Sequence, residues 1–256
     1  MKRYQFIELV FEKVKLNLRA EARKTYLSFG WWFLEPILYI GVFYVVFAVF
    51  LATRTENFLV FLCCGNIPFV WFSRSVSNSA QSIVLGRSLM NQVQIPKVFF
   101  PAVVVMQDLF KALLVFAVLL LFVYFIGFTP TIAWLSLPLL ILAQLVLICA
   151  VALFVSMIIP FLPDLRFIVA TVLQLLMFAS GIFYSYEDVI LPEHRSLFLL
   201  NPVANLIRMY REVLMAGQWP DWLDLGLIIL VSLLAIAVLL VVMKKLDSTY
   251  PRLVLQ

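Results

Sequence analysis

From residue 112 to residue 163 the chain runs for 52 residues without a single Asp, Glu, Lys or Arg. A turn-like segment, Gly-Phe-Thr-Pro-Thr at 127–131, interrupts this run. Because about 20 apolar residues cross a bilayer as a helix, the run predicts two membrane helices joined by a hairpin. Further long uncharged runs cover 36–53, 167–186 and 225–243. The sequence therefore predicts an integral membrane protein.

The composition fits a chain whose main solvent is lipid. Of the 256 residues, 64% are hydrophobic and 13% are charged, whereas a soluble domain carries about 25% charged residues. The segments outside the uncharged runs are too short for a separate soluble domain, so one membrane domain is expected over 1–256. The first residues lack the apolar stretch and cleavage site of a signal peptide. We expect the first span to act as the insertion signal.

The predicted fold class is an all-α integral membrane protein with six transmembrane helices. The spans are expected at 30–51, 57–76, 101–126, 132–159, 166–186 and 222–243. With both termini in the cytoplasm, 14 Lys and Arg residues fall in cytoplasmic segments when Arg74 and Arg166 at the span ends are included, and four fall in outer loops. This asymmetry satisfies the positive-inside rule. We therefore place both termini in the cytoplasm.

Residue types that carry catalytic or metal-binding chemistry are few and scattered. Cys63, Cys64 and Cys149 lie inside predicted spans without zinc or haem spacing, which favours buried free thiols. His194 lies in a polar loop with no second histidine or cysteine nearby, which argues against a metal or a catalytic dyad. A Gly-rich phosphate loop, paired carboxylates and a serine elbow are also missing. No catalytic residue, metal or cofactor is expected on this chain, so energy for any work must come from another chain or an ion gradient.

Residues 1–25 are predicted to form an amphipathic interface helix along the inner membrane surface. Apolar residues recur on one side at helical spacing: Ile7, Val10, Phe11, Val14 and Leu18. Basic residues on the other side suit anionic lipid headgroups. Two interpretations remain open, a surface anchor and a contact for a phosphate-bearing lipid, whose phosphates would favour Arg19, Arg23 and Lys24.

Two stripes at helical spacing mark the first and fifth predicted spans. The first-span stripe is aromatic and contains Trp32, Tyr39, Phe43 and Phe47. The fifth-span stripe contains Gln174, Phe178, Gly181 and Ser185, spaced by four, three and four residues. Aromatic stripes in membrane helices usually face lipid or pack in the protein, but rings also stack on the apolar faces of sugars. Small residues in the fifth-span stripe would permit close approach of a second subunit.

The longest cytoplasmic connection, between spans two and three, is predicted to carry a short coupling helix within 87–97. This helix is expected from Ser88 to Gln94, because a proline at 96 disfavours helix in the residue before it. It has the size of a docking element for a cytosolic partner. On the third span, Asp108 and Lys111 can pair on one face. Mutual neutralisation and contact with a substrate are the two interpretations of that pair.

An amphipathic helix is also predicted on the outer side, between spans five and six. Asn201 followed by Pro202 is typical of a helix start, and Gly217 is typical of a helix end. The polar face of this helix is formed by Arg208, Arg211 and Glu212. An element of this kind can dip into the outer leaflet and act as a gate.

Several of these features occur in a specific order along nearly the whole chain. The interface helix leads into TYLSFGWWFLEP at 25–36, the coupling loop ends in IPKVFFP at 95–101, and Asn201-Pro202 with Arg211 follows the fifth span. In this order they resemble the membrane subunit of ABC-2 type polysaccharide exporters, with the closest similarity to permeases for O-antigen and the next to those for capsule and teichoic acid. The chain departs from that family at Pro163-Asp164, where Arg-Asp is often found.

The resemblance implies a multi-pass permease of the bacterial inner membrane. It would form a homodimer and bind two copies of a cytosolic ATP-binding cassette ATPase that holds ATP and Mg. The substrate would be a glycan on a polyprenyl diphosphate, moved through a channel lined by the two stripes, with Arg19, Arg23 and Lys24 meeting the diphosphate. The ATPase contacts would be Ser88, Leu89, Met90, Asn91, Gln92 and Asp164. Membrane lipids are expected as partners, and nucleic acid is not.

Other function classes stay open at this point. A permease of the same fold could export a drug or a lipid, and an ion-gradient secondary transporter or a membrane enzyme would be a different class. An inverted repeat of broken helices would favour the secondary transporter, and the sequence shows none. A neighbouring ATPase reading frame would decide for the ABC exporter, and glycan genes beside it would decide for the substrate.

Overall fold

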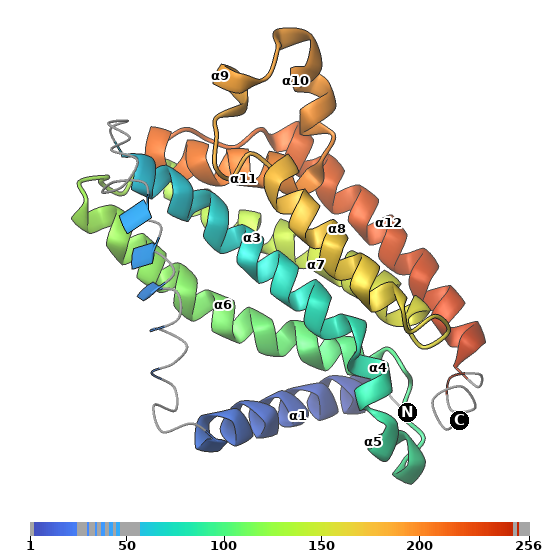
Figure 1. The fold of residues 1–256 in the computed structure, drawn as a ribbon. Coiled ribbons are helices and arrows are strands. Elements are labelled where there is room, and N and C mark those ends of the chain that lie inside the picture. The colour runs from blue at the N-terminus through green and yellow to red at the C-terminus, as the bar shows by residue number, and fades with distance from the viewer. Residues whose placement is uncertain are drawn as a thin grey trace.

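The computed structural model describes residues 3–24 and 57–247, Tyr250, and isolated positions between 30 and 46. Every element formed by these residues is helical (Figure 1). The longer helices are α1 (Arg3–Lys24), α3 (Phe58–Ala80), α6 (Phe99–Phe125), α7 (Leu137–Ile158), α8 (Leu165–Ala179) and α12 (Trp222–Leu246). The shorter ones are α4 (Ser82–Leu85), α5 (Arg87–Gln92), η2 (Ile132–Ser136), α9 (Tyr186–Val189), α10 (Pro192–Leu199), α11 (Pro202–Arg211) and η3 (Glu212–Ala216).

The helices form a bundle with two different ends (Figure 1). At one end α9 and α10 project beyond the bundle, and we call this the hairpin end. At the opposite end lie α1, α4, α5 and the last turn of α12, and we call this the termini end. Here α1 packs against α6.

Among the residues that the structure describes, four helical segments are long and apolar enough to cross a bilayer. They are α3, α6, η2 with α7, and α12. These segments agree with four of the predicted spans, at 57–76, 101–126, 132–159 and 222–243. The first predicted span, at 30–51, lies largely outside the described residues.

The fifth predicted span, at 166–186, corresponds to the shorter helix α8. This helix ends at Ala179 after 15 residues, and it is about 22 Å long at about 1.5 Å per residue. Gly181 then adopts a left-handed conformation with φ of 66°, which a residue without Cβ tolerates, and the chain turns. Gly181 and Ser185 therefore do not continue the helical face of Gln174 and Phe178. The prediction of one shared face for all four residues is wrong.

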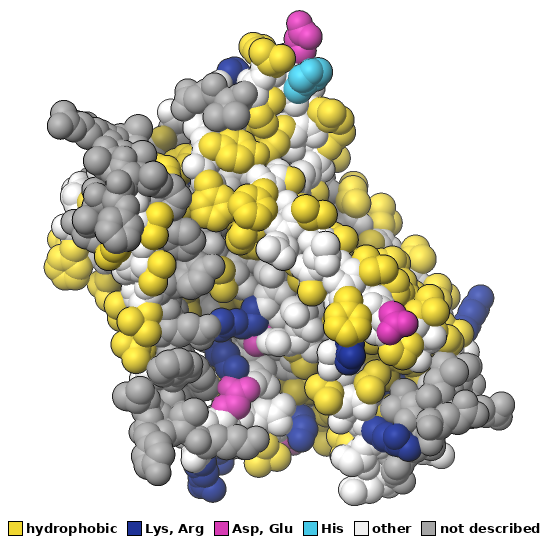
Figure 2. All heavy atoms as spheres, in the orientation of Figure 1, with side chains coloured by type: hydrophobic (Ala, Val, Ile, Leu, Met, Phe, Trp, Pro, Cys, Tyr) yellow, Lys and Arg dark blue, Asp and Glu magenta, His cyan; other side chains and the backbone are white. Residues whose placement is uncertain are grey.

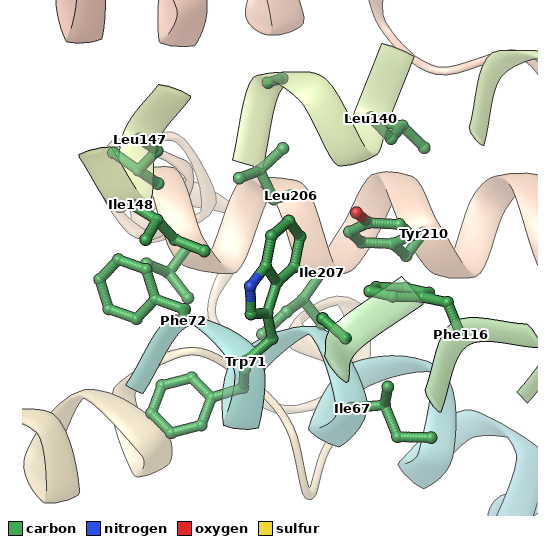
Figure 3. Packing of buried hydrophobic residues seen from close by; sticks show 14 of the residues in the cluster. Ile67, Trp71, Phe72, Phe116, Leu140, Leu147, Ile148, Leu206, Ile207 and Tyr210 are labelled. Carbon is green, nitrogen blue, oxygen red and sulfur yellow. The ribbon is translucent and has the colours of Figure 1, made fainter. Parts of the chain in front are cut away.

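The central helix of the bundle is α3, which packs against α6, α7, α8 and α11. Residues 62–69 of α3 are all buried. Trp71 of α3 meets the edge of the Phe116 ring of α6, with ring centroids 5.9 Å apart (Figure 3). The Phe116 ring in turn lies 5.5 Å from that of Tyr210 on α11. The amphipathic helix α11 is thus part of the main core, although it lies outside the predicted spans.

A second apolar cluster lies at the termini end and joins α1, α4, α6, α7 and α12. Its buried members are Val10, Val14, Ile83, Ile95, Phe99, Phe100, Val103, Leu153, Met243 and Tyr250. The Tyr250 hydroxyl donates to the carbonyl oxygen of Met157 (3.3 Å), and the Tyr250 ring lies 5.5 Å from that of Phe161. Asp247 accepts a hydrogen bond from the backbone N–H of Lys97 (2.9 Å). The segment after α12 therefore fastens both the connection before α6 and the connection after α7.

Replacing Tyr250 with Ala should destabilise the protein, because this side chain is fully buried in the second cluster. Truncating a buried aromatic residue costs about 3–5 kcal/mol in soluble cores, so we expect a clear fall in the melting temperature of the detergent-solubilised protein. Tyr250→Phe is the matched control. It keeps the ring and removes only the hydrogen bond to Met157, which is worth about 1 kcal/mol. Equal melting temperatures for wild type and Tyr250→Ala would contradict the packing described.

Candidate functional site

The interface helix α1 presents apolar and basic side chains as predicted. Val10 and Val14 are buried, whereas Ile7 and Phe11 are 56% and 44% exposed. Exposed apolar residues on such a helix fit contact with lipid as well as protein. Of the predicted phosphate contacts, Arg19 and Arg23 are exposed, and the side chain of Lys24 lies outside the described residues.

Polar side chains also hold α1 where it meets α6. Asn17 donates to Oε1 of Gln107 (3.1 Å), and Gln107 donates to Glu21. Lys111 of α6 forms an ion pair with Glu21, with 2.6 Å between Nζ and Oε2. This end of α1 is therefore attached by charge and hydrogen bonds, and not only by apolar packing.

The contacts of Asp108 and Lys111 differ from the predicted pairing of these two residues. Lys111 pairs with Glu21 of α1, and Asp108 accepts a hydrogen bond from Asn78 of α3 (3.0 Å). The reason is that α1 and α3 bring partners to α6 that its own sequence does not reveal. We call the six residues Asn17, Glu21, Asn78, Gln107, Asp108 and Lys111 the polar junction. Basic and acidic side chains lie close together in the region where α1, α3 and α6 meet (Figure 2).

The connection between α3 and α6 contains the predicted coupling helix. It is observed as α5, from Arg87 to Gln92, and ends two residues earlier than expected because Val93 is extended. Of the predicted partner contacts, Ser88 and Gln92 are exposed, Leu89 and Met90 pack partly against the second cluster, and the Asn91 side chain lies outside the described residues. Asp164 is exposed in the connection between α7 and α8.

The same connection exposes apolar side chains outside the long apolar helices. Val84, Leu85 and Val93 are 39%, 75% and 52% exposed. Gly86 allows this connection to lie on the start of α6, because a Cβ at this position would come within 2.2 Å of the Phe100 ring. Apolar side chains grouped at the end of a bundle suit a protein partner.

Helix α8 is exposed on most of its circumference. Leu173 is its one buried residue. One face carries Phe167, Thr171, Gln174 and Phe178, which are all exposed. This face combines two rings with a hydroxyl and an amide, so it offers both stacking and hydrogen bonds. The aromatic residues of the first-span stripe, Trp32, Tyr39, Phe43 and Phe47, lie outside the described residues.

Arg211 is predicted to lie on the polar face of the outer amphipathic helix. In the structure its guanidinium is held by backbone carbonyls of other segments. Its Nη1 and Nη2 donate to the carbonyl oxygens of Gly181 and Ile182, each at 2.8 Å. Its Nε donates to the carbonyl oxygen of Phe61 (3.2 Å), and the guanidinium lies 3.4 Å from the centroid of the Phe61 ring, a favourable cation–π contact. Gly65 makes room, since a Cβ there would come within 2.5 Å of Nη2. Arg211 thus ties the start of α3 and the turn after α8 to α11.

Arg208 belongs to a separate charged cluster that joins α11 to α12. Its Nη2 donates to Oδ2 of Asp224 (2.9 Å), and its Nη1 lies 3.2 Å from Oε1 of Glu212. Asn205 donates to the same Asp224 oxygen (3.0 Å) and accepts from Arg208. Burial raises the pKa of Glu212 above its ordinary value, and Arg208 opposes that rise. The sequence did not identify Asn205 or Asp224 as members of this cluster, because the two lie on different helices.

The predicted start and end of the outer amphipathic helix are confirmed. Asn201 accepts a hydrogen bond from the backbone N–H of Val203 (3.0 Å), as an N-cap does. Its side-chain amide also donates to Oγ of Ser180 (3.0 Å). Gly217 follows η3 in a left-handed conformation with φ of 65°. Asn201 therefore connects the end of α8 to the start of α11.

These features are suited to binding and not to catalysis. The polar junction and the α8 face carry hydrogen-bonding groups, and the connection between α3 and α6 carries apolar ones. Within the part of the chain that the structure describes, no group of three or more His, Cys, Asp or Glu residues could hold a metal ion.

Comparison with known proteins gives consistent matches. Residues 10–215 match the family model of the ABC-2 type transporter. The chain is 31% identical to the O-antigen export system permease protein RfbA of Myxococcus xanthus over 219 residues, which cover 85% of this chain and 84% of that protein. It is 25% identical to RfbA of Klebsiella pneumoniae over 202 residues, 78% of each chain. It is also 24% identical to the polysialic acid transport protein KpsM of Escherichia coli over 227 residues, 86% of each chain.

Arg211→Lys should loosen the hairpin end of the bundle. A single ammonium cannot reach the carbonyls of Phe61, Gly181 and Ile182 together, as the planar guanidinium does, and each lost bond to a charged donor costs about 1.5–3 kcal/mol. We expect amide hydrogen exchange within 180–201 to become at least about ten-fold faster, which corresponds to about 1.4 kcal/mol. The control is Arg166→Lys at an exposed position on α8. Unchanged exchange in Arg211→Lys would show that the clamp does not hold this segment.

Proposed function

Since the chain belongs to the ABC-2 type transporter family, we propose that it is the membrane subunit of an ATP-driven exporter for a polysaccharide carried on a polyprenyl diphosphate. The observation that carries this proposal is the likeness to O-antigen export permeases over most of both chains. O-antigen is therefore the proposed substrate, and the bacterial inner membrane is the proposed location. The likeness to a polysialic acid transport protein favours an acidic capsule polysaccharide as the second candidate.

For the topology we propose six spans with both termini in the cytoplasm. Four long apolar helices support this arrangement, with α8 as a short fifth span and 30–51 as the first. The excess of Lys and Arg in the segments assigned to the cytoplasm supports the orientation. The termini end, with α1, α4 and α5, then faces the cytoplasm, and the hairpin end faces outward. Arg208, Arg211 and Glu212 lie at that outer end, where they would hold the gate segment and not line it.

The partner that supplies energy is proposed to be a pair of ATP-binding cassette ATPases that hold ATP and Mg. The chain itself has no phosphate-binding loop, so hydrolysis must occur elsewhere. The proposed docking surface combines the exposed apolar residues Val84, Leu85 and Val93 with the α5 residues and Asp164. Support comes from the 75% exposure of Leu85, because an apolar side chain in water favours burial against a protein.

Leu85→Asp should weaken the ATPase complex and reduce export. The change places a charge in the proposed apolar contact, which costs about 2 kcal/mol or more at a desolvated interface. We expect copurification of the ATPase to fall while the permease stays folded in the membrane. Leu200→Asp is the matched control, since Leu200 is also 75% exposed but lies next to α10 at the opposite end. An equal loss of ATPase copurification in both variants would contradict the proposed docking surface. If no ATPase copurified with the wild-type protein, the proposal of an ABC exporter would be wrong.

The channel is proposed to lie at the interface of a homodimer, between α8 and the first span of each subunit. The exposure of α8 on most sides supports this arrangement, because a membrane helix with one buried residue has room for a second subunit. Gln174 and Phe178 would line the channel together with Trp32, Tyr39, Phe43 and Phe47. Gly181 and Ser185 would lie at its outer mouth, beyond the end of α8.

Phe178→Ala should slow export and leave ATP hydrolysis largely intact. Ring stacking on sugars contributes about 0.5–1.5 kcal/mol per contact, so we expect export to fall about two- to ten-fold. Val172→Ala is the control, because Val172 is 53% exposed against 55% for Phe178 but lies on another face of α8. Export is to be measured as glycan appearing outside membrane vesicles. A similar loss in both variants, or in neither, would place the channel elsewhere.

The lipid diphosphate is proposed to arrive beside α1. Arg19 and Arg23 are exposed on this helix. The helix lies at the termini end of the bundle, which faces the cytoplasm in the proposed topology. With Lys24 they would attract the phosphates of a carrier lipid in the inner leaflet.

A further inference from the structure

Helix α3 has a single open patch, and every residue in that patch is hydrophilic. Between 58 and 80 the exposed residues are Arg74, Ser77 and Asn78. Other long helices expose apolar side chains instead, such as Leu121 of α6 and Leu234 of α12, at 58% and 59%. An unsatisfied polar group in hydrocarbon costs several kcal/mol. The patch is therefore not a surface for acyl chains.

The patch lies in the half of α3 that is nearer the termini end. Arg74 is about 24 Å along the helix from Phe58, at about 1.5 Å per residue. An ionisable residue at this depth marks a functional surface by default. In the proposed topology the patch lies in the cytoplasmic half of the membrane, where a lipid headgroup would leave the inner leaflet.

The patch is continuous with the polar junction. Asn78 belongs to both, and it donates to Asp108. Arg74 lies one helical turn before Asn78 on α3, and residues four apart on a helix are neighbours, so Arg74 lies at the edge of the junction. Glu21 is neutralised by Lys111 at 2.6 Å. The two carboxylates are thus held by their neighbours, and a polar surface extends from α1 to the open patch of α3.

We propose that this patch borders a water-filled path through the cytoplasmic half of the membrane, and that Arg74 binds a phosphate group of the carrier lipid there. The choice of ligand rests on the proposed function, whereas the path rests on the exposed residues of α3. A guanidinium has five N–H donors in a planar fork that matches phosphate oxygens. Arg74 can therefore keep partners within the protein and still contact a phosphate, with the Ser77 hydroxyl one turn further along.

The path is tested by the reactivity of single cysteines with a charged, membrane-impermeant methanethiosulfonate. The test protein has its three native cysteines replaced by Ala and carries the single substitution Ser77→Cys. It is labelled in inverted membrane vesicles, which expose the cytoplasmic side. We expect at least ten-fold faster labelling than for Ser75→Cys, which is fully buried on the same helix. Leu234→Cys is the lipid-facing control. Labelling of Ser77→Cys no faster than of Leu234→Cys would overturn the path.

The phosphate contact is tested in proteoliposomes that contain the Ser77→Cys protein and either a polyprenyl phosphate or the uncharged polyprenol. We expect the phosphate to slow labelling several-fold and the alcohol to have little effect. Arg74→Gln should abolish this protection, and Arg74→Lys should keep part of it. Unliganded labelling of Ser77→Cys in both variants shows whether they fold. Protection that survives in Arg74→Gln, or equal protection by the alcohol, would overturn the contact and leave the path standing. Failure of the wild type to export glycan would instead overturn the proposed function.

Discussion

A bilayer offers no hydrogen-bond partners, and this constraint decides where the chain can turn or carry a charge. The turn after α8 brings the carbonyls of Gly181 and Ile182 to one point, where Arg211 donates to both of them and also to Phe61. Arg208 finds Asp224 and Glu212 in a similar way. Because the charges of α11 have partners inside the protein, its apolar side can join the main core. The hairpin end of the bundle therefore depends on two arginines, which a hydropathy profile would assign to a loop.

Long apolar runs were enough to predict α3, α6, α7 and α12, because the free energy of placing a span in lipid depends on local composition. The Asn201 cap was equally local. The end of α8 at Ala179 was not predicted, although Gly181 is a local signal for a turn, because the partner of the exposed carbonyls in that turn is Arg211, 30 residues beyond Gly181. An uncharged run up to residue 186 therefore suggested a longer helix than exists. The pairing of Lys111 with Glu21 escaped prediction for the same reason, because helix packing brings together residues that are distant in sequence.

The candidate site was predicted in part, and the omissions have a physical origin. Gln174 and Phe178 share an exposed face as expected, but Thr171 and Phe167 belong to that face and were not singled out. The sequence held a signal for the open patch of α3, because Arg74, Ser77 and Asn78 recur at helical spacing near the end of a span. Arg74 was counted as a cytoplasmic charge instead. Positive-inside reasoning treats a basic residue near a span end as an anchor, so it cannot recognise one that belongs to a polar surface within the membrane.

The second cluster packs the elements at the termini end into one body, so a movement at one of them can be transmitted to the others. Ile95 and Phe100, next to the proposed ATPase surface, share this cluster with Val10 and Val14 of α1. Close-packed interiors have low compressibility and transmit strain. A displacement applied at α5 would therefore move α1 as well, and with it Glu21, which pairs with Lys111 at the polar junction. Tyr250 attaches the connection after α7 to the same unit, and Asp247 attaches the connection before α6. The place where energy would be applied and the place where a lipid phosphate would bind are thus parts of one packed body, and no separate signal between them is required.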